Sequence, residues 1–264
     1  MDDSQTLALM PADMADLRMK LLTAADMDEF KKYAEEKDYV SRIREIIHPT
    51  TQQTLIFYAC NILDDTKAFR AVEVLAKMGV TAVQMDHLHQ TALFYASRNG
   101  LTSVVEWLVK AGNAVNHLDN ISQSALFYAS SKSQLGCMQR LLDLEANPNT
   151  VDSNGQTPLF YAANCNSLEA CKLLVSHGAR ADHRDRSKPK RCTASQWARD
   201  RRYHDVADYL AEVSKEGRRS FGKKDSLGDL EKKIDKQTGK VVLSADAKAA
   251  LAARPKPGVK RQRS

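Results

Sequence analysis

The residues of this chain that could do chemistry are its seven histidines and five cysteines. Two histidines stand close together in Asp86-His87-Leu88-His89, and a later stretch holds Cys165, Cys171 and His177. Imidazole and thiolate are ligands that zinc prefers, but a zinc site needs them at one point in space. The two cysteines are at helical spacing in a segment well separated from the histidine pair. We therefore expect no metal site and no cofactor.

Sequence motifs of catalysis are missing as well. The sequence contains no glycine-rich loop that could cradle a phosphate, no Gly-x-Ser-x-Gly nucleophile motif and no His-Glu-x-x-His motif. The histidines are scattered through the segments that we expect to be hairpins and loops. We accordingly predict that the protein is not an enzyme.

Cysteine usage and hydropathy bear on where the protein works. The five cysteines form an odd number without a Cys-x-x-Cys pair, and the N-terminus lacks the charged and then apolar pattern of a signal segment. These features indicate reduced thiols in the cytoplasm or nucleus, with Cys60, Cys137 and Cys171 as small core residues. No stretch approaches the roughly 18 apolar residues of a membrane span, so we expect no membrane association.

The basic charge of the chain is concentrated at its end. The formal net charge is +6, yet acidic residues outnumber basic ones in residues 1–179, and Lys and Arg dominate residues 213–264. Because the apolar residues of this tail are too scattered to offset the entropy of folding, we expect it to be mostly disordered.

The closing run of the tail holds the cations Arg254, Lys256, Lys260, Arg261 and Arg263. Such a run is typical of a nuclear import signal, a contact with nucleic acid or a solvated, solubilising end. Since no aromatic residues alternate with these charges, sequence-specific reading of nucleic acid is not expected.

A repeated motif predicts the elements that must position any functional residue. Close copies of Gly155-Gln-Thr-Pro-Leu-Phe-Tyr-Ala-Ala163 begin around Thr91 and Ser124, and Thr91, Ser124 and Thr157 are each 33 positions apart. A further copy begins at Thr54 and a decayed one at Thr193. A period of 33 residues indicates a repeat architecture.

Apolar columns within each period predict two helices. Leu or Ile stands two residues after the Thr or Ser, and Ala stands five after it, which places one apolar stripe on a short helix. Pairs such as Val104-Val105 begin a second amphipathic helix. Gly79, Gly112 and Gly178 follow at the position of a left-handed C-cap, and an Asp such as Asp119 indicates a hairpin with Asp at its tip.

The segment Asp152-Ser-Asn-Gly-Gln-Thr-Pro-Leu-Phe-Tyr-Ala-Ala163 resembles the ankyrin-repeat consensus Asp-x-x-Gly-x-Thr-Pro-Leu-His-x-Ala-Ala. The resemblance covers roughly residues 50–212 and implies an all-α ankyrin-repeat solenoid of helix-turn-helix-hairpin units. We expect a disordered N-terminus at 1–12, a diverged N-terminal capping repeat at 13–48, about five repeats at 49–212, and the basic, mostly disordered tail at 213–264.

The chain departs from the consensus by carrying Phe in place of the motif His, at Phe57, Phe94, Phe127 and Phe160. The family His helps to tie neighbouring repeats by hydrogen bonds, so we expect the Phe column to tie them by packing. A neighbouring aromatic column either fills the space between inner helices or offers a strip to a partner: Tyr58, Tyr95, Tyr128, Tyr161 and Trp197. A glutamine column either faces a partner or forms an interlocking amide ladder: Gln53, Gln90, Gln123 and Gln156.

The resemblance also implies which residues face the concave, partner-binding groove. Carried onto this chain, they are His87, Leu88, Gln90, Arg98 and Asn99 in the second repeat, Asn120, Ile121, Gln123, Ser131 and Lys132 in the third, and Ser153, Asn154, Gln156 and Asn164 in the fourth. Leu88 and Ile121 are the most informative, because apolar side chains at hairpin tips either contact a partner or pack between the hairpins.

By resemblance, the function is a non-enzymatic interaction module or scaffold, a monomer that binds a protein partner through the concave face of its repeats. The alternative is a nuclear adaptor whose basic tail contacts nucleic acid or chromatin while the repeats recruit a protein. Because folds of this kind serve many roles, the resemblance does not name the partner.

Overall fold

A computed structural model describes residues 11–24, 26–41, 43–48, 50–186 and 191–222. These residues are mostly helical and contain no strand, apart from one isolated antiparallel bridge between Arg184 and Thr193. The chain divides into two units, Met1–Lys215 and Glu216–Ser264, and the description below concerns the first. The expected disorder of residues 1–12 and 213–264 falls largely on residues outside the described ranges, namely 1–10 and 223–264.

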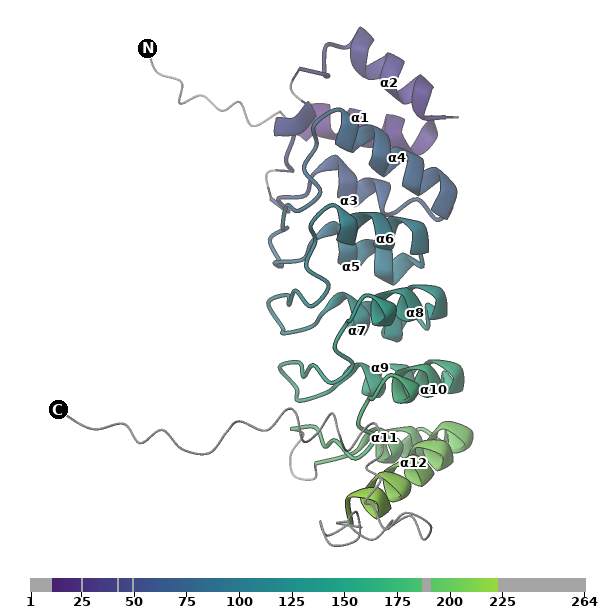
Figure 1. The fold of residues 1–264 in the computed structure, drawn as a ribbon. Coiled ribbons are helices and arrows are strands. Elements are labelled where there is room, and N and C mark those ends of the chain that lie inside the picture. Colours follow the sequence, from purple (N-terminus) through teal and green to yellow (C-terminus); the bar gives the residue numbers. More distant parts are fainter. Residues whose placement is uncertain (1–10, 25, 42, 49, 187–190, 223–264) are drawn as a thin grey trace, which may run out of the picture. The chain divides into compact units, whose positions relative to one another are not determined.

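Helices come in pairs along the chain, each pair joined by a short turn (Figure 1). The pairs are α1 (Pro11–Thr23) with α2 (Met27–Glu36), α3 (Leu55–Ala59) with α4 (Asp65–Lys77), α5 (Ala92–Asn99) with α6 (Thr102–Lys110), α7 (Ala125–Ser131) with α8 (Leu135–Asp143), α9 (Pro158–Asn164) with α10 (Leu168–Ser176), and α11 (Ala194–Asp200) with α12 (His204–Gly222). A 3₁₀ helix, η1 (Ile43–Glu45), follows α2.

Local sequence accounts for where these helices begin and end. Thr or Ser occupies the N-cap of each motif helix with extended backbone, as Thr91 does before α5. Thr193 forms a capping box with Gln196 at the start of α11. After the second helices, Gly79, Gly112 and Gly178 have φ values of 90°, 103° and 86°, the left-handed conformation predicted for these C-terminal glycines.

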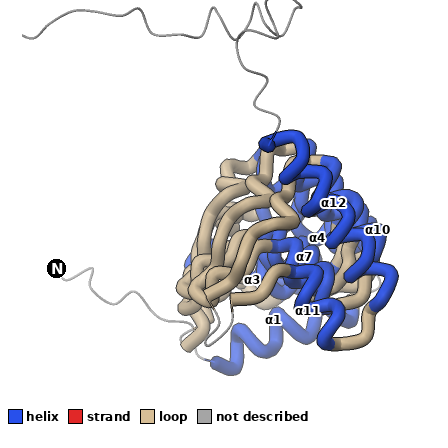
Figure 2. The backbone as a smooth tube through the Cα atoms, turned by 90° about the horizontal axis from the view of Figure 1, so that it is seen from below, coloured by secondary structure: helices blue, strands red, loops and turns tan. Residues whose placement is uncertain are grey.

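Equivalent helices of successive pairs stack on each other. The first helices α3, α5, α7, α9 and α11 contact in series, and so do the second helices α4, α6, α8 and α10. The pair α1–α2 contacts α3 and α4 in the same way. Figure 2 shows the hairpin loops gathered on one side of the helices. The stack therefore has a first-helix layer next to the hairpins and a second-helix layer behind it.

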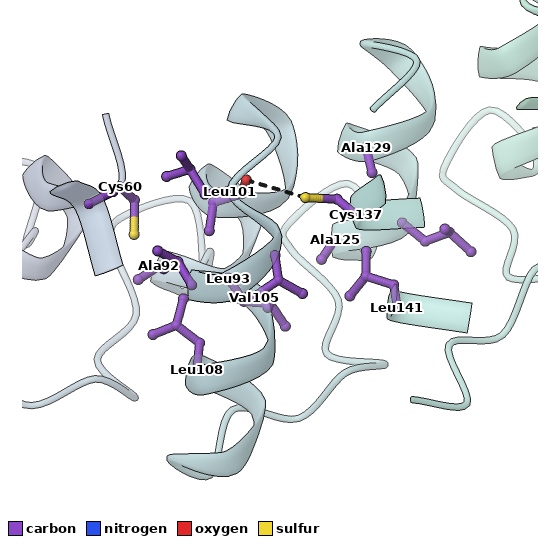
Figure 3. Packing of buried hydrophobic residues seen from close by; sticks show 14 of the residues in the cluster. Cys60, Ala92, Leu93, Leu101, Val105, Leu108, Ala125, Ala129, Cys137 and Leu141 are labelled. Atoms are coloured by element: carbon purple, nitrogen blue, oxygen red, sulfur yellow. Dashed lines mark hydrogen bonds between the residues drawn. The ribbon is translucent and has the colours of Figure 1, made fainter. Parts of the chain in front are cut away.

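The core lies between these two helix layers and continues from one repeat to the next. The motif leucines Leu93, Leu126 and Leu159 are fully buried, as are the motif alanines. Figure 3 shows Cys137 among Leu101, Ala129 and Leu141, with its Sγ directed at the carbonyl oxygen of Ala96 at 4.0 Å. Cys60, Cys137 and Cys171 are buried small core residues, as predicted.

Aromatic pairs join neighbouring repeats, as the Phe column predicted. The ring of Tyr95 packs edge-on against Phe57 of the preceding repeat, with centroids 5.3 Å apart. Tyr128 contacts Phe94, and Tyr161 contacts Phe127, with the same geometry. Edge-to-face packing is a favoured arrangement of aromatic rings. Packing between these rings therefore ties the repeats where the consensus has a histidine.

Two boundaries differ from the sequence-based expectation. Helix α1 begins at Pro11, and α12 continues to Gly222 rather than ending near residue 212. Val213 packs against the core with Val206 and Leu210, so the apolar stripe of α12 extends beyond the repeat columns. The first motif helix, α3, is short. Thr54 and Thr91 are 37 positions apart rather than 33, so this repeat is four residues longer than the next, and residues 60–64 form the turn before α4.

The aromatic column provides a test of the stacking. Phe127 is fully buried, so Phe127→Ala should lower the free energy of unfolding by about 3–5 kcal/mol, because it removes the ring and leaves a cavity. Urea unfolding followed by far-UV circular dichroism measures this change. Leu135→Ala, at a 41 % exposed position, is the control and should cost less than about 1 kcal/mol. Equal costs for the two substitutions would contradict the packing described.

Candidate functional site

The hairpin between successive repeats is built around a buried aspartate. Oδ1 of Asp119 accepts hydrogen bonds from the backbone N–H groups of Ile121 and Gln123, at 3.0 and 2.9 Å. Asp86 and Asp152 make the equivalent pairs of bonds. These carboxylates are buried rather than at the hairpin tip, because their role is to hold the turn from within.

The second carboxylate oxygen links three segments of two repeats. Oδ2 of Asp119 accepts a hydrogen bond from the Tyr128 hydroxyl of its own repeat at 2.8 Å and from Nε2 of Gln90 in the preceding repeat at 3.0 Å. Gln90 also donates to the Tyr128 oxygen at 2.6 Å. We call this arrangement an Asp–Tyr–Gln cluster. It recurs as Asp86–Tyr95–Gln53 and Asp152–Tyr161–Gln123.

In the last repeat, the bond between the aromatic residue and the aspartate is present, but the bond from glutamine to the aromatic residue is not. Trp197 takes the place of Tyr, and its Nε1 donates to Oδ2 of the buried Asp185 at 3.0 Å. An indole has no acceptor, so it cannot receive the bond that glutamine gives to tyrosine elsewhere. The Gln156 side chain is half-buried and makes no hydrogen bond to a residue in the described ranges.

Backbone hydrogen bonds place successive hairpin tips in register. The N–H of Asn120 donates to the carbonyl of Leu88 at 3.1 Å, and the N–H of Ser153 donates to the carbonyl of Ile121 at 3.0 Å. His87 and Arg186 make the equivalent bonds to Thr51 and Asn154. We call the residues at these tips the tip row: His87, Leu88, Asn120, Ile121, Ser153, Asn154 and Arg186.

A second row runs along the C-terminal ends of the first helices. Arg98 follows Tyr95 by three positions, and Lys132 follows Tyr128 by four, so each lies on the same side of its helix as the tyrosine. Arg201 lies over the Trp197 ring at 4.5 Å from its centroid. The helix-end row is defined as Arg98, Lys132, Cys165 and Arg201. The Asp–Tyr–Gln clusters therefore lie between two rows of residues.

The structure places the predicted binding residues in three classes of exposure. The exposed ones are His87, Leu88, Arg98, Asn120, Ile121, Lys132, Ser153, Asn154 and Asn164. Asn99, Ser131 and Gln156 are half-buried. Gln90 and Gln123 are only 7 % exposed and engaged in the clusters. The basic residues Arg254, Lys256, Lys260, Arg261 and Arg263 lie outside the described residues.

Apolar side chains at the tips are open to solvent. Leu88 is 41 % exposed and Ile121 is 49 % exposed. Met85 and Leu118, which precede the hairpin aspartates, are exposed to a similar extent and were not selected from the sequence. The signal that could have found them was their shared column, one residue before each Asp. Two adjacent hairpins thus carry four exposed apolar side chains.

Several thiols and hydroxyls of the stack are poor nucleophiles. Burial raises the pKa of the Cys137 thiol to about 11 and that of Cys171 to about 12. Burial, and then the hydrogen bond to aspartate, raises the pKa of Tyr95, Tyr128 and Tyr161 above the ordinary value. All of these groups are therefore protonated at neutral pH.

Within the described ranges, no cluster of His, Cys, Asp and Glu is suited to a metal ion, and no helix is long and apolar enough to cross a membrane. Comparison with known proteins gave one family match. A family model of ankyrin repeats in three copies matches residues 56–152, 93–185 and 126–221. No curated protein matches the chain.

The clusters make a prediction about alkaline stability. Tyr128→Phe removes the hydroxyl that bonds Asp119 and Gln90, so it should lower the free energy of unfolding by about 1–3 kcal/mol at pH 7. Because the folded pKa of Tyr128 is raised, the stabilisation is complete below the unfolded value of about 10 and is lost as pH rises above it.

Urea unfolding at pH 7, 9 and 11 tests this expectation. The stability difference between the wild type and Tyr128→Phe should be constant from pH 7 to 9 and narrower at pH 11. Tyr203→Phe is the control, because that hydroxyl makes no hydrogen bond with a described residue. A difference that widens with pH would contradict the cluster.

Proposed function

The chain belongs to the ankyrin-repeat family, and we propose that it is a non-enzymatic scaffold module that binds a protein partner through the tip row and the helix-end row. Ankyrin repeats are generally protein–protein interaction modules and typically lack enzymatic activity. We also propose that the protein is a monomer and that it acts in the cytoplasm, the nucleus or both. The two rows lie on either side of the face that, from the resemblance to ankyrin repeats, we expect to be concave.

One observation carries the proposal: Leu88 and Ile121 are exposed on hairpins joined by a backbone hydrogen bond. If packing between the hairpins were their only role, these side chains would be buried, yet 41 % of Leu88 and 49 % of Ile121 remain exposed. Apolar side chains that remain exposed in register favour contact with another molecule. Met85 and Leu118 enlarge the same surface.

The hydrogen bonds that hold the tip row support this assignment. The tips at Leu88, Ile121 and Asn154 are each held by two backbone bonds to a buried aspartate and by a bond to a neighbouring tip. The aspartate is in turn anchored to the first helix and the preceding repeat. A surface that is already ordered loses little conformational entropy on binding, which favours affinity.

A second candidate function rests on the concentration of Lys and Arg in residues 213–264. In this case the protein is a nuclear adaptor whose tail contacts nucleic acid or chromatin while the repeats recruit a protein. Charge supplies most of the affinity of such contacts, so they depend strongly on salt.

The apolar tips provide the test of the first proposal. Leu88→Ala combined with Ile121→Ala should reduce capture of the specific partner from native lysate by at least about ten-fold, because apolar anchors dominate protein interfaces. Quantitative mass spectrometry of the captured proteins measures this change. Val83→Ala is the matched control, since Val83 is as exposed as Ile121, at 49 %, but is not one of the tip residues. Unchanged capture by the double variant would contradict the assignment.

The tail is tested by replacing Arg254, Lys256, Lys260, Arg261 and Arg263 with Gln in the full chain. If the tail contacts nucleic acid, wild-type affinity for a duplex DNA probe should fall steeply between 50 and 200 mM salt, and the variant should show a shallower slope. Fluorescence anisotropy measures both slopes. Equal slopes for wild type and variant would argue against the nuclear-adaptor function.

A further inference from the structure

The exposed charges of the tip row and the helix-end row are all positive. Arg98, Lys132, Arg186 and Arg201 contribute them, and none of the four makes an ion pair with a residue in the described ranges. The hairpin aspartates Asp86, Asp119 and Asp152 are buried and engaged with tyrosine, glutamine and backbone N–H groups, whereas Asp200, which takes the place of Arg98 in the last repeat, is exposed. Around Arg98 and Lys132 the face therefore presents cations to solvent and keeps the hairpin carboxylates inside.

Cations on the second helices are arranged differently. Lys77, Lys110 and Lys172 each lie within 3.0 Å of a glutamate on their own helix, and Arg140 of α8 lies 2.8 Å from Glu106 of α6. Lys67 and Arg70 of α4 are exceptions, since neither has an ion-pair partner among the described residues, and Lys67 Nζ donates instead to the carbonyl of Ala24. Among the described residues, glutamates thus accompany most cations of α4, α6, α8 and α10 but none of those in the two rows.

The composition of the tip row changes along the stack. Leu88 and Ile121 stand at adjacent tips, and Asn154 occupies the equivalent position in the next hairpin. Arg186, which is equivalent to Ser153, lies at the tip after that. Each step is fixed by the backbone hydrogen bonds that hold the tips in register. One end of the row is thus apolar, the middle is polar and the other end is cationic.

We propose that the two rows bind an extended acidic peptide segment of a partner protein, with apolar side chains on Leu88 and Ile121 and carboxylates directed at Arg98, Lys132 and Arg186. This inference rests on the proposed function and specifies the chemistry of its partner. Carboxylates suit arginine because its guanidinium offers several donors in a plane. The unpaired charges also accelerate encounter with an acidic segment.

The same face is poorly suited to nucleic acid, the other polyanion that cations attract. Single-stranded nucleic acid needs exposed aromatic rings on which bases stack. Here Tyr95, Tyr128 and Tyr161 are half-buried, and each packs against a phenylalanine of the preceding repeat. Apolar tips also have no counterpart on a phosphate backbone. An acidic peptide with apolar residues matches both features of the face.

The experiment selects peptides from a random 14-residue display library with the full chain as bait. Enriched peptides should contain two apolar residues together with Asp or Glu on one consistent side. The strongest peptide is then synthesised twice, once unchanged and once with every Asp and Glu replaced by Asn and Gln. Fluorescence anisotropy should show that the neutral peptide binds about three- to ten-fold more weakly.

Two charge variants then locate the site. Arg98→Gln, Lys132→Gln and Arg186→Gln together should weaken the acidic peptide about three- to ten-fold and leave its neutral counterpart unchanged. Arg70→Gln, Lys77→Gln and Lys172→Gln remove the same charge from the second helices and should leave both affinities unchanged. Because the basic tail is identical in the two variants, it contributes equally to both. Thermal unfolding confirms that each variant is folded.

Three outcomes would overturn the inference: no enrichment of peptides, enrichment of neutral or basic ones, or equal weakening by both variants. A competition experiment adds single-stranded DNA that carries the same total negative charge as the acidic peptide. If this DNA displaces the peptide from the wild type, and the variant of Arg98, Lys132 and Arg186 no longer binds the DNA, the face would instead be assigned to nucleic acid. If the peptide inference fails while partner capture still depends on Leu88 and Ile121, the proposed function stands. If that dependence is also lost, both fail.

Discussion

The buried aspartate of each hairpin is the constraint on which the rest of the structure depends. A carboxylate can be buried only when its oxygens are well supplied with hydrogen bonds. Asp119 obtains them from two backbone N–H groups of its hairpin, from Tyr128 and from Gln90. Satisfying one buried charge thus fixes the turn, docks it on the first helix and joins two repeats. The same solution serves Asp86 and Asp152.

This constraint has consequences for the surface. The aspartates, the tyrosine hydroxyls and the glutamine amides are used within the stack, so the chemistry left for a partner lies at the tips and helix ends. There the chain places the apolar side chains of Leu88 and Ile121 and the cations of Arg98 and Lys132, which form no ion pair with the part of the chain that the structure describes. The residues that hold the stack together are the same type in one hairpin after another. The residues at the tips, in contrast, change in chemistry from one repeat to the next. Such variation on a constant frame gives a repeat protein its binding specificity.

The period and its apolar columns were sufficient to predict the helix pairs, the left-handed glycines and the packing role of the phenylalanines. They were not sufficient to decide whether the residues of the glutamine column contact a partner or bond within the stack. Gln90 meets Asp119 and Tyr128, which are 29 and 38 positions later, and a column aligns equivalent residues without showing which columns meet across a repeat boundary. The aspartate was for the same reason expected at an exposed tip. The exposure of Met85 and Leu118 depends on how the hairpins pack, which hydrophobicity alone does not reveal.

The most direct test of this account is a double-mutant cycle across one repeat boundary, between Gln123 and Tyr161. The single variants Gln123→Ala and Tyr161→Phe and their combination are compared with the wild type by urea unfolding. If the cluster joins the repeats as described, the two residues should be coupled by about 0.5–3 kcal/mol. If the loss of unfolding free energy in the double variant equals the sum of the losses in the two single variants, the hydrogen bonds of the cluster do not hold neighbouring repeats together. That result would contradict the central role of the aspartate.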